Sequence, residues 1–213
     1  MISHEYGHIL VAKSLGCETQ LHYASDTHRN SVLIKRLNQI LDENYTAFEN
    51  KEDFAEKLEF DNGMQKLKRD AFFIALGGPM QTMLTGTLGF FLLFFRKDKI
   101  KKEGMLAFDW LAVFMALFWL REIFNLVYAL PSYLFGKRVK WFGGDEYKIS
   151  KYLELWPGTL SVVLGVMGLI VALIVVFKFV PQHLRITFIV SGLAGGGLGF
   201  FLWTRMLGPI ILP

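Results

Sequence analysis

The side chains best placed to do chemistry stand at the start of the sequence, in the run His4, Glu5, Tyr6, Gly7, His8. Histidines four residues apart lie on one face of an α-helix, so both imidazoles can reach one Zn²⁺ ion at about 2.0 to 2.1 Å. Glu5 stands beside the first histidine, where its carboxylate can take a proton from a water molecule that attacks a carbonyl carbon. The spacing is the His-Glu-x-x-His pattern of zinc peptidases, with Glu5 as the predicted base.

The alternative interpretation is that His4 and His8 are ordinary histidines on the surface of a helix. The apolar run Ile9–Ala12 follows them directly and continues the helix toward an apolar environment. Ionisable side chains in a membrane segment are costly and usually mark a working site. Three of them within one turn therefore favour a metal site over a surface helix.

A zinc hydrolase also needs a third protein ligand and one open position for water. The chain has one cysteine, which excludes a thiolate cluster and an intrachain disulfide framework. Asp145 is the preferred third ligand, because Gly143 and Gly144 before it permit a tight turn that directs a carboxylate back toward the bilayer. With Trp141 and Phe142 they are predicted to form a re-entrant turn. The alternatives that remain open are Glu146, Glu122, His22, His28 and His183.

The composition indicates that the bilayer is the main solvent for this chain. Of its 213 residues, 53% are hydrophobic and 20 are phenylalanine, which excludes intrinsic disorder. The net charge of +4 comes from short basic loops between apolar blocks, an ordinary feature of membrane topology. A nucleic-acid binder would instead gather its basic residues on one helix or face, so nucleic acid is not an expected partner. No basic segment followed by an apolar core opens the chain, so no signal peptide is predicted.

Four long apolar stretches predict the membrane spans, at residues 71–95, 105–135, 155–177 and 186–204. At 1.5 Å per residue they match or exceed the roughly 30 Å of hydrocarbon, and the second is too long for one straight span. Pro131 is predicted to end or kink that second span. Residues 1–16 reach only about 24 Å, so this helix either enters part of the bilayer or belongs to a longer one.

The polar part of the chain lies between the first motif and the first long span. The alternation over residues 17–33 predicts a short hairpin, and apolar side chains at helical spacing after it predict two amphipathic helices. Asn50 is expected to cap the second helix, and Asp61 to Gly63 to form a turn before the span.

These observations predict an all-α fold, a polytopic integral membrane helix bundle of about five membrane segments with a small amphipathic helical insertion. The expected divisions are an active-site helix over 1–16, a polar insertion over 17–70, core spans with the third-ligand segment over 71–150, and a C-terminal transmembrane hairpin over 151–213. The expected location is a membrane crossed several times, which in a bacterium is the cytoplasmic membrane.

The motifs together resemble the site-2 protease family of intramembrane zinc metalloproteases. The first sixteen residues are similar to that family's first core helix, a glycine-proline element follows in the second span, and an Asn and Pro segment leads to a ligand aspartate. The residues that carry the resemblance are His4, Glu5, Gly7, His8, Ala12, Gly16, Gly77, Gly78, Pro79, Asn125, Pro131 and Asp145.

The resemblance implies a zinc-dependent endopeptidase that cuts peptide bonds within or beside the bilayer, as in regulated intramembrane proteolysis. His4, His8 and Asp145 would hold Zn²⁺, Glu5 would activate water, and Asn125 would donate a hydrogen bond to the developing oxyanion. The expected partners are the lipid bilayer and a membrane-spanning protein or peptide as substrate. Two alternatives stay open: a pseudoprotease that binds metal or a partner helix without turnover, and, ranked last, a small transporter.

Overall fold

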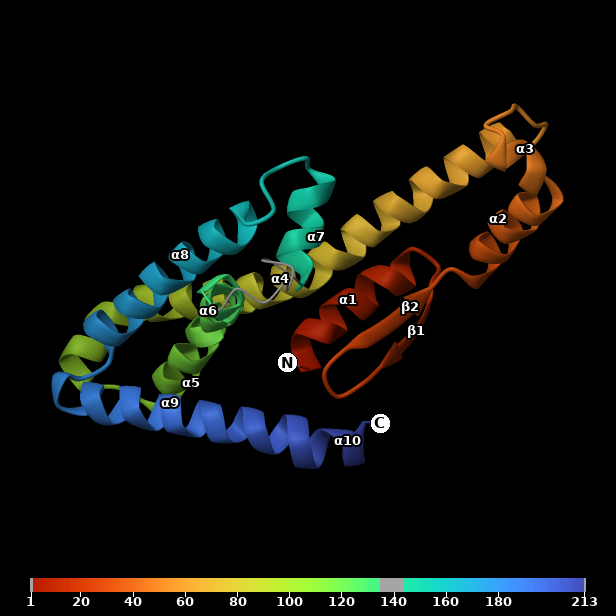
Figure 1. Cartoon of the computed structure of the whole chain (residues 1–213). Helices are drawn as coiled ribbons and strands as arrows, with labels where there is room; N and C mark the ends of the chain where they lie inside the picture. The colour runs from red at the N-terminus through yellow and green to blue at the C-terminus, as the bar shows by residue number, and fades with distance from the viewer. Residues whose placement is uncertain (1, 135–143, 213) are drawn as a thin grey trace.

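The computed structural model describes residues 2–134 and 144–212, with the backbone alone over 128–134. Most of these residues are helical, as expected, and one two-stranded hairpin interrupts the helices (Figure 1). In chain order the main elements are α1 (Ile2–Ser14), β1 (Glu18–Leu21), β2 (Asp26–Arg29), α2 (Ser31–Glu43), α3 (Tyr45–Glu49), α4 (Lys57–Glu103), α5 (Ala107–Ala116), α6 (Leu120–Leu134), α7 (Gly144–Tyr152), α8 (Thr159–Ile174), α9 (Arg185–Leu202) and α10 (Gly208–Ile211).

Helix α4 is the axis on which the other elements are arranged. It is 47 residues long, which corresponds to about 70 Å. Helices α1, α5 and α7 pack along it (Figure 1). Within the described residues, four helices are long and apolar enough to cross a membrane, and they are Lys57–Glu103, Ala107–Val127, Thr159–Phe179 and Gln182–Ile211.

Glycines bring α1 and α4 into close contact. A Cβ atom on Gly7 would lie 2.4 Å from the carbonyl oxygen of Gly77, and one on Gly77 would lie 2.5 Å from the carbonyl oxygen of Gly7. Both distances are far below van der Waals contact, so only glycine at both positions allows this crossing. The same residues were singled out in the sequence, and here they set the depth at which the histidines of α1 meet α4.

The polar insertion folds partly as predicted. The hairpin expected within residues 17–33 is present as antiparallel β1 and β2, and Asn30 caps α2 by accepting a hydrogen bond from the Leu33 backbone N–H at 3.1 Å. The turn predicted at Asp61 to Gly63 is wrong, because these residues lie inside α4. Gly63 is needed there for packing: a Cβ atom would lie 2.6 Å from the Leu37 side chain of α2.

The start predicted for the second helix at Asn50 is also corrected, because Asn50 is the C-cap of α3. Helix α3 stops at Glu49, the chain is irregular around Lys51, and the next helix is α4 itself, beginning at Lys57. Lys51 has a φ of 58°, a left-handed conformation that a helix does not continue through. The insertion and the first span are therefore joined by one continuous helix.

The long apolar stretch at 105–135 is divided by a 3-10 turn at Leu117–Trp119, between α5 and α6. Pro131 does not end the helix, because α6 runs through it to Leu134. Helices α4 and α5 share an apolar core with the segment Val175–Phe179 that continues α8, and this core includes Leu93, Val113 and Val175.

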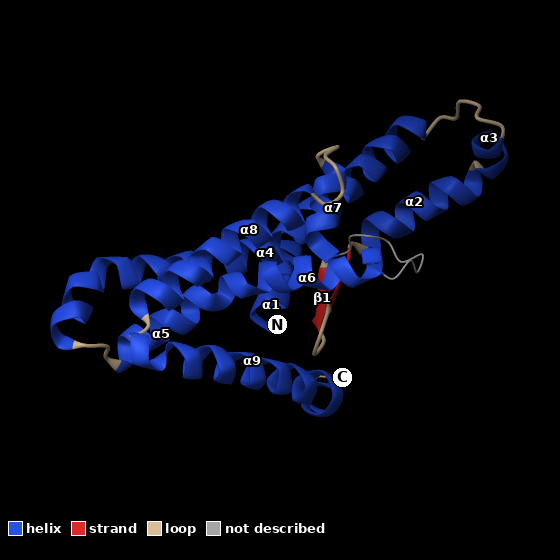
Figure 2. Ribbon diagram, turned by 60° about the vertical axis from the view of Figure 1, so that its left-hand side comes forward, coloured by secondary structure: helices blue, strands red, loops and turns tan. Residues whose placement is uncertain are grey.

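Helix α9 lies apart from the rest of the bundle over much of its length, as Figure 2 shows. None of its residues is buried. Its contacts are aromatic, and they include Phe188 against Trp110 and Phe200 against Phe124. Beyond it the chain returns to the hairpin, where the Trp203 indole N–H donates to the Tyr23 carbonyl at 2.7 Å.

Candidate metal centre

The structure brings the three residues predicted as zinc ligands to one point, although Asp145 is 137 residues from His8 in sequence. The Asp145 Oδ2 atom lies 3.1 Å from His4 Nε2 and 3.1 Å from His8 Nε2. Tetrahedral ligands bound at about 2.0 to 2.1 Å are about 3.3 Å apart, so these separations suit a shared zinc ion. Both histidines are almost fully buried, with exposed fractions of 2% and 3%.

The other ring nitrogen of each histidine is held by α4. The Thr82 hydroxyl donates to the Gly78 carbonyl at 3.1 Å, so it accepts from His4 Nδ1–H at 3.0 Å. The Ile74 carbonyl, which can only accept, lies 2.6 Å from His8 Nδ1. The Gly78 backbone N–H also points at His8 Nδ1, at 3.2 Å, but the Ile74 carbonyl is closer and favours a hydrogen on that nitrogen. With Nδ1 held in this way, each ring can present Nε2 to a metal ion beside Asp145, as histidine ligands do in zinc proteins.

Gly78 leaves space at the centre of this cluster. A Cβ atom built there would lie 2.4 Å from His8 Nε2 and 2.5 Å from His4 Nε2. Any other side chain would thus occupy the position between the two nitrogens. Pro79 follows inside α4 and removes one helical hydrogen bond at this depth. The glycine-proline element therefore shapes the cluster. The space that Gly78 leaves open between the two Nε2 atoms fits a metal ion.

Glu5, the predicted base, is buried beside the ligands. One of its carboxylate oxygens, a nitrogen of His8 and an oxygen of Asp26 all lie within 4.8 Å of one another. Arg121 of α6 approaches from the other side, with Nη2 4.0 Å from Glu5 Oε1. A cation at this distance offsets part of the cost of burying the Glu5 carboxylate.

Asn125, predicted to donate a hydrogen bond to an oxyanion, contacts Glu146 in this structure. Its amide donates to Glu146 Oε1 at 2.8 Å, across from α6 to α7. Glu146, an alternative ligand, is thereby turned away from the histidines that Asp145 contacts, and it is 2% exposed. This bond tethers the beginning of α7, and the oxyanion role of Asn125 stays a prediction.

The remaining alternative ligands lie elsewhere. Glu122 is buried in α6, where its carboxyl group interacts with that of Glu146 and not with the histidines. His183 lies in the 3-10 turn between α8 and α9, and His22 in the turn of the hairpin. His28 of β2 is closest to the cluster, because it shares a small cavity of about 150 Å³ with His8 and Asp145.

Two carboxylates of the cluster are held in their ionised form. Burial is the largest single influence on the pKa of Asp145 and would raise it. Hydrogen bonds from His4 and His8, which an imidazole donates when its Nε2 carries a proton in place of a metal ion, outweigh burial and hold the pKa of Asp145 well below its ordinary value. Burial likewise opposes ionisation of Asp26, and the hydrogen bond from His28 at 2.8 Å lowers its pKa overall. Asp145 is thus present in the form that ligates metal ions.

The turn predicted to carry Asp145 lies mainly outside the described residues, since Trp141, Phe142 and Gly143 are among residues 135–143. Gly144 is described and has a φ of 79°, a left-handed conformation that favours glycine. Gly144 directly precedes Asp145 at the start of α7. The Asp145 side chain is 17% exposed. The described end of the segment therefore directs Asp145 inward.

Two residues of the site did not emerge from the sequence. Thr82 stands one helical turn after Gly78, so the spacing offered a signal once Gly78 was placed at the site. Asp26 lies in a short polar strand, and no spacing in that segment points to a metal site. Only the fold of the hairpin against α1 brings it there.

Comparison of the chain with protein-family models, with curated proteins and with solved structures finds no match. The functional assignment therefore depends on the residues and their geometry.

Proposed function

We propose that this chain is a zinc-dependent endopeptidase that cuts peptide bonds within or beside a membrane, similar to the site-2 proteases. The observation that carries the proposal is the convergence of two imidazole lone pairs and one carboxylate oxygen at 3.1 Å. Three electron-rich atoms at this separation repel one another unless a metal ion or a proton lies between them. The buried position excludes bulk water as the source of that compensation and favours a bound metal ion.

His4, His8 and Asp145 would hold the zinc ion and leave a fourth position open. When bound, zinc supplies Lewis acidity and lowers the pKa of water toward about 7. Glu5 takes the proton of the attacking water and returns it to the leaving amine as the carbon–nitrogen bond breaks. Arg121, near Glu5, orients that carboxylate and offsets its charge.

Water has routes to this site through small cavities. One of about 220 Å³ is lined by Ser3, His4, Thr82 and Arg121 among others. A second, of about 150 Å³, lies on the hairpin side beside His8, Asp26 and Asp145. Hydrolysis consumes one water per peptide bond, so polar access of this kind is a requirement of the proposed reaction.

The depth of the site indicates the substrate class. The cluster lies beside Ile74 to Thr82, inside the uncharged stretch 71–95 of a helix long enough to span a membrane. A peptide bond can reach it only at that depth. The proposed substrate is therefore a membrane-spanning protein or peptide, unwound locally to expose its amide, and the proposed location is an integral membrane one.

The test separates metal binding from turnover. Glu5→Gln should keep zinc at the wild-type stoichiometry and lose cleavage of a reporter membrane helix by at least about 1000-fold, because the general base is removed while the ligands remain. Glu59→Gln, on the exposed part of α4, is the matched control and should cleave normally. Normal cleavage by Glu5→Gln would refute the proposed mechanism. Zinc bound without cleavage by the wild type would favour a pseudoprotease.

A further inference from the structure

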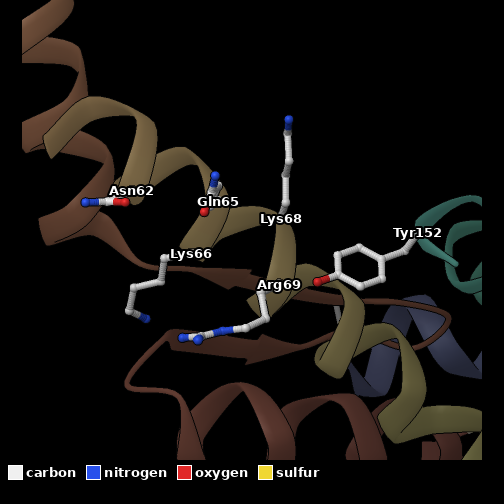
Figure 3. Close-up of a pocket in the computed structure, with 6 residues that line it drawn as sticks. All are labelled: Asn62, Gln65, Lys66, Lys68, Arg69 and Tyr152. Atoms are coloured by element: carbon white, nitrogen blue, oxygen red, sulfur yellow. The ribbon is translucent and has the colours of Figure 1, made fainter. Parts of the chain in front are cut away.

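A third cavity, remote from the metal centre, lies where α4 meets the far end of α7. Its volume is about 510 Å³, and Figure 3 shows the side chains around it. They come from a single stretch of α4 and from the last residue of α7. The lining residues are Asn62, Gln65, Lys66, Lys68, Arg69 and Tyr152.

The cavity is positively charged. Three of its lining residues are cations, and within the described part of the chain the acid that pairs with them is the buried Asp70 of the same helix. Lys66 pairs closely with Asp70 at 2.5 Å, whereas Arg69 Nε is 3.8 Å away. The Arg69 guanidinium and the Lys68 ammonium therefore keep most of their donors for an external anion. A guanidinium fork matches the oxygens of a phosphate group.

The position of the cavity along α4 indicates where that anion comes from. Lys68 and Arg69 stand directly before Ala71, where the uncharged stretch 71–95 begins. In the proposed membrane placement they lie at the level of the lipid headgroups. Beyond Tyr152, Trp156 exposes 60% of its surface, as aromatic residues do at a membrane–water boundary. Basic residues at this level attract anionic lipids.

Tyr152 links the cavity to the metal centre. Its ring stacks on Phe72 of α4 with centroids 4.3 Å apart and planes inclined by 20°. In Figure 3 its hydroxyl points toward α4, near the point where Arg69 leaves the helix, whereas the Arg69 guanidinium extends away from it and Lys68 extends to the opposite side. Asp145 stands at the other end of the same short helix, about 10 Å away by helical rise. A ligand that fixes Tyr152 against α4 therefore also fixes the helix that carries Asp145.

We propose that this cavity binds the phosphate of an anionic phospholipid headgroup and thereby holds α7 against α4. The inference rests on the membrane placement in the proposed function, but not on peptidase activity. The exposed Lys68 and Arg69 side chains turn toward the phosphate when it binds. The amides of Asn62 and Gln65 donate to the headgroup, and the Tyr152 hydroxyl completes the site.

Lipid retention measures this binding without reference to zinc or cleavage. The purified protein is released from nanodiscs of phosphatidylcholine with a minor fraction of phosphatidylglycerol, and retained lipids are identified by native mass spectrometry. Each basic residue at a membrane surface contributes about fivefold to binding, so Lys68→Gln with Arg69→Gln should weaken phosphatidylglycerol retention by about 30-fold. The charge-preserving pair Lys68→Arg with Arg69→Lys should retain most of it.

The matched control removes two cations from the other end of the same helix. Lys101→Gln with Lys102→Gln makes an equal change in charge at exposed positions of α4 and should retain phosphatidylglycerol as the wild type does. Equal losses in both double variants would show a general charge effect and overturn the site. Displacement of the lipid from the wild-type protein by millimolar inorganic phosphate would overturn the headgroup assignment in favour of a soluble phosphate. Because the wild type is used in that arm, the test does not depend on the folding of a variant.

Discussion

Substitution of Gly78 by alanine places one methyl group at the centre of the metal site. Its carbon would lie 2.5 Å from His4 Nε2 and 2.4 Å from His8 Nε2. Non-bonded contact requires about 3.5 Å, so each imidazole must withdraw by about 1 Å. Metal–ligand distances tolerate only about 0.2 Å. We therefore expect zinc affinity to fall by at least about 100-fold, the upper end of the loss seen when an outer partner of a ligand is removed.

Competition with a chromophoric chelator measures this affinity on detergent-solubilised protein. Overpacking at the α1–α4 crossing should cost about 1 to 3 kcal/mol of stability, so helicity and the unfolding midpoint are recorded in parallel. Gly195→Ala is the matched control, because nothing lies within 4 Å of a Cβ atom there, and it should leave zinc affinity within about twofold of wild type. A folded Gly78→Ala protein that binds zinc with wild-type affinity would refute the placement of the ion between the two Nε2 atoms.

Three further substitutions test the supports of the site. Thr82→Val removes the acceptor for a histidine N–H, and the chelator assay should show zinc affinity about 10- to 100-fold weaker; an unchanged value would contradict the assigned tautomer. Asn125→Ala leaves the Glu146 carboxylate buried without its donor, so denaturant unfolding should show a loss of about 1 to 3 kcal/mol; a loss no larger than that of an exposed substitution would show that the tether contributes nothing. Gly7→Ala forces the helices apart at the Gly77 carbonyl, and both zinc affinity and the unfolding midpoint should fall; no change in either would contradict the close crossing.

The local part of the site could be predicted from sequence because helical periodicity determines it. His4 and His8 share a face by spacing alone, and the fold places both Nε2 atoms together. Asp145 was predicted as a ligand because the preceding glycines permit a tight turn. The φ of 79° at Gly144 shows that conformation. Its approach to the histidines depends on how α7 packs on α4, which no local pattern encodes.

The errors in the fold came from competition between local signals and packing. The Asp-Asn-Gly run at 61–63 is typical of a turn, yet it continues α4 because Gly63 receives the Leu37 side chain of α2. Pro131 was expected to end or kink its helix, and α6 does not end there but runs on to Leu134. Asp26 could not be predicted as part of the site, because a hairpin places it there through long-range contact with α1. At Gly63 tertiary packing overrides the local turn propensity.

The zinc content of the purified protein tests the central claim most directly. The protein is expressed with zinc, stripped of loosely bound metal by gel filtration, and measured by plasma mass spectrometry beside His8→Ala and the exposed-histidine control His183→Ala. The geometry predicts about one zinc ion per chain for the wild type and for His183→Ala, and less than about a tenth of that for His8→Ala. Equal zinc in the wild type and His8→Ala, or none in either, would contradict a metal centre built from His4, His8 and Asp145.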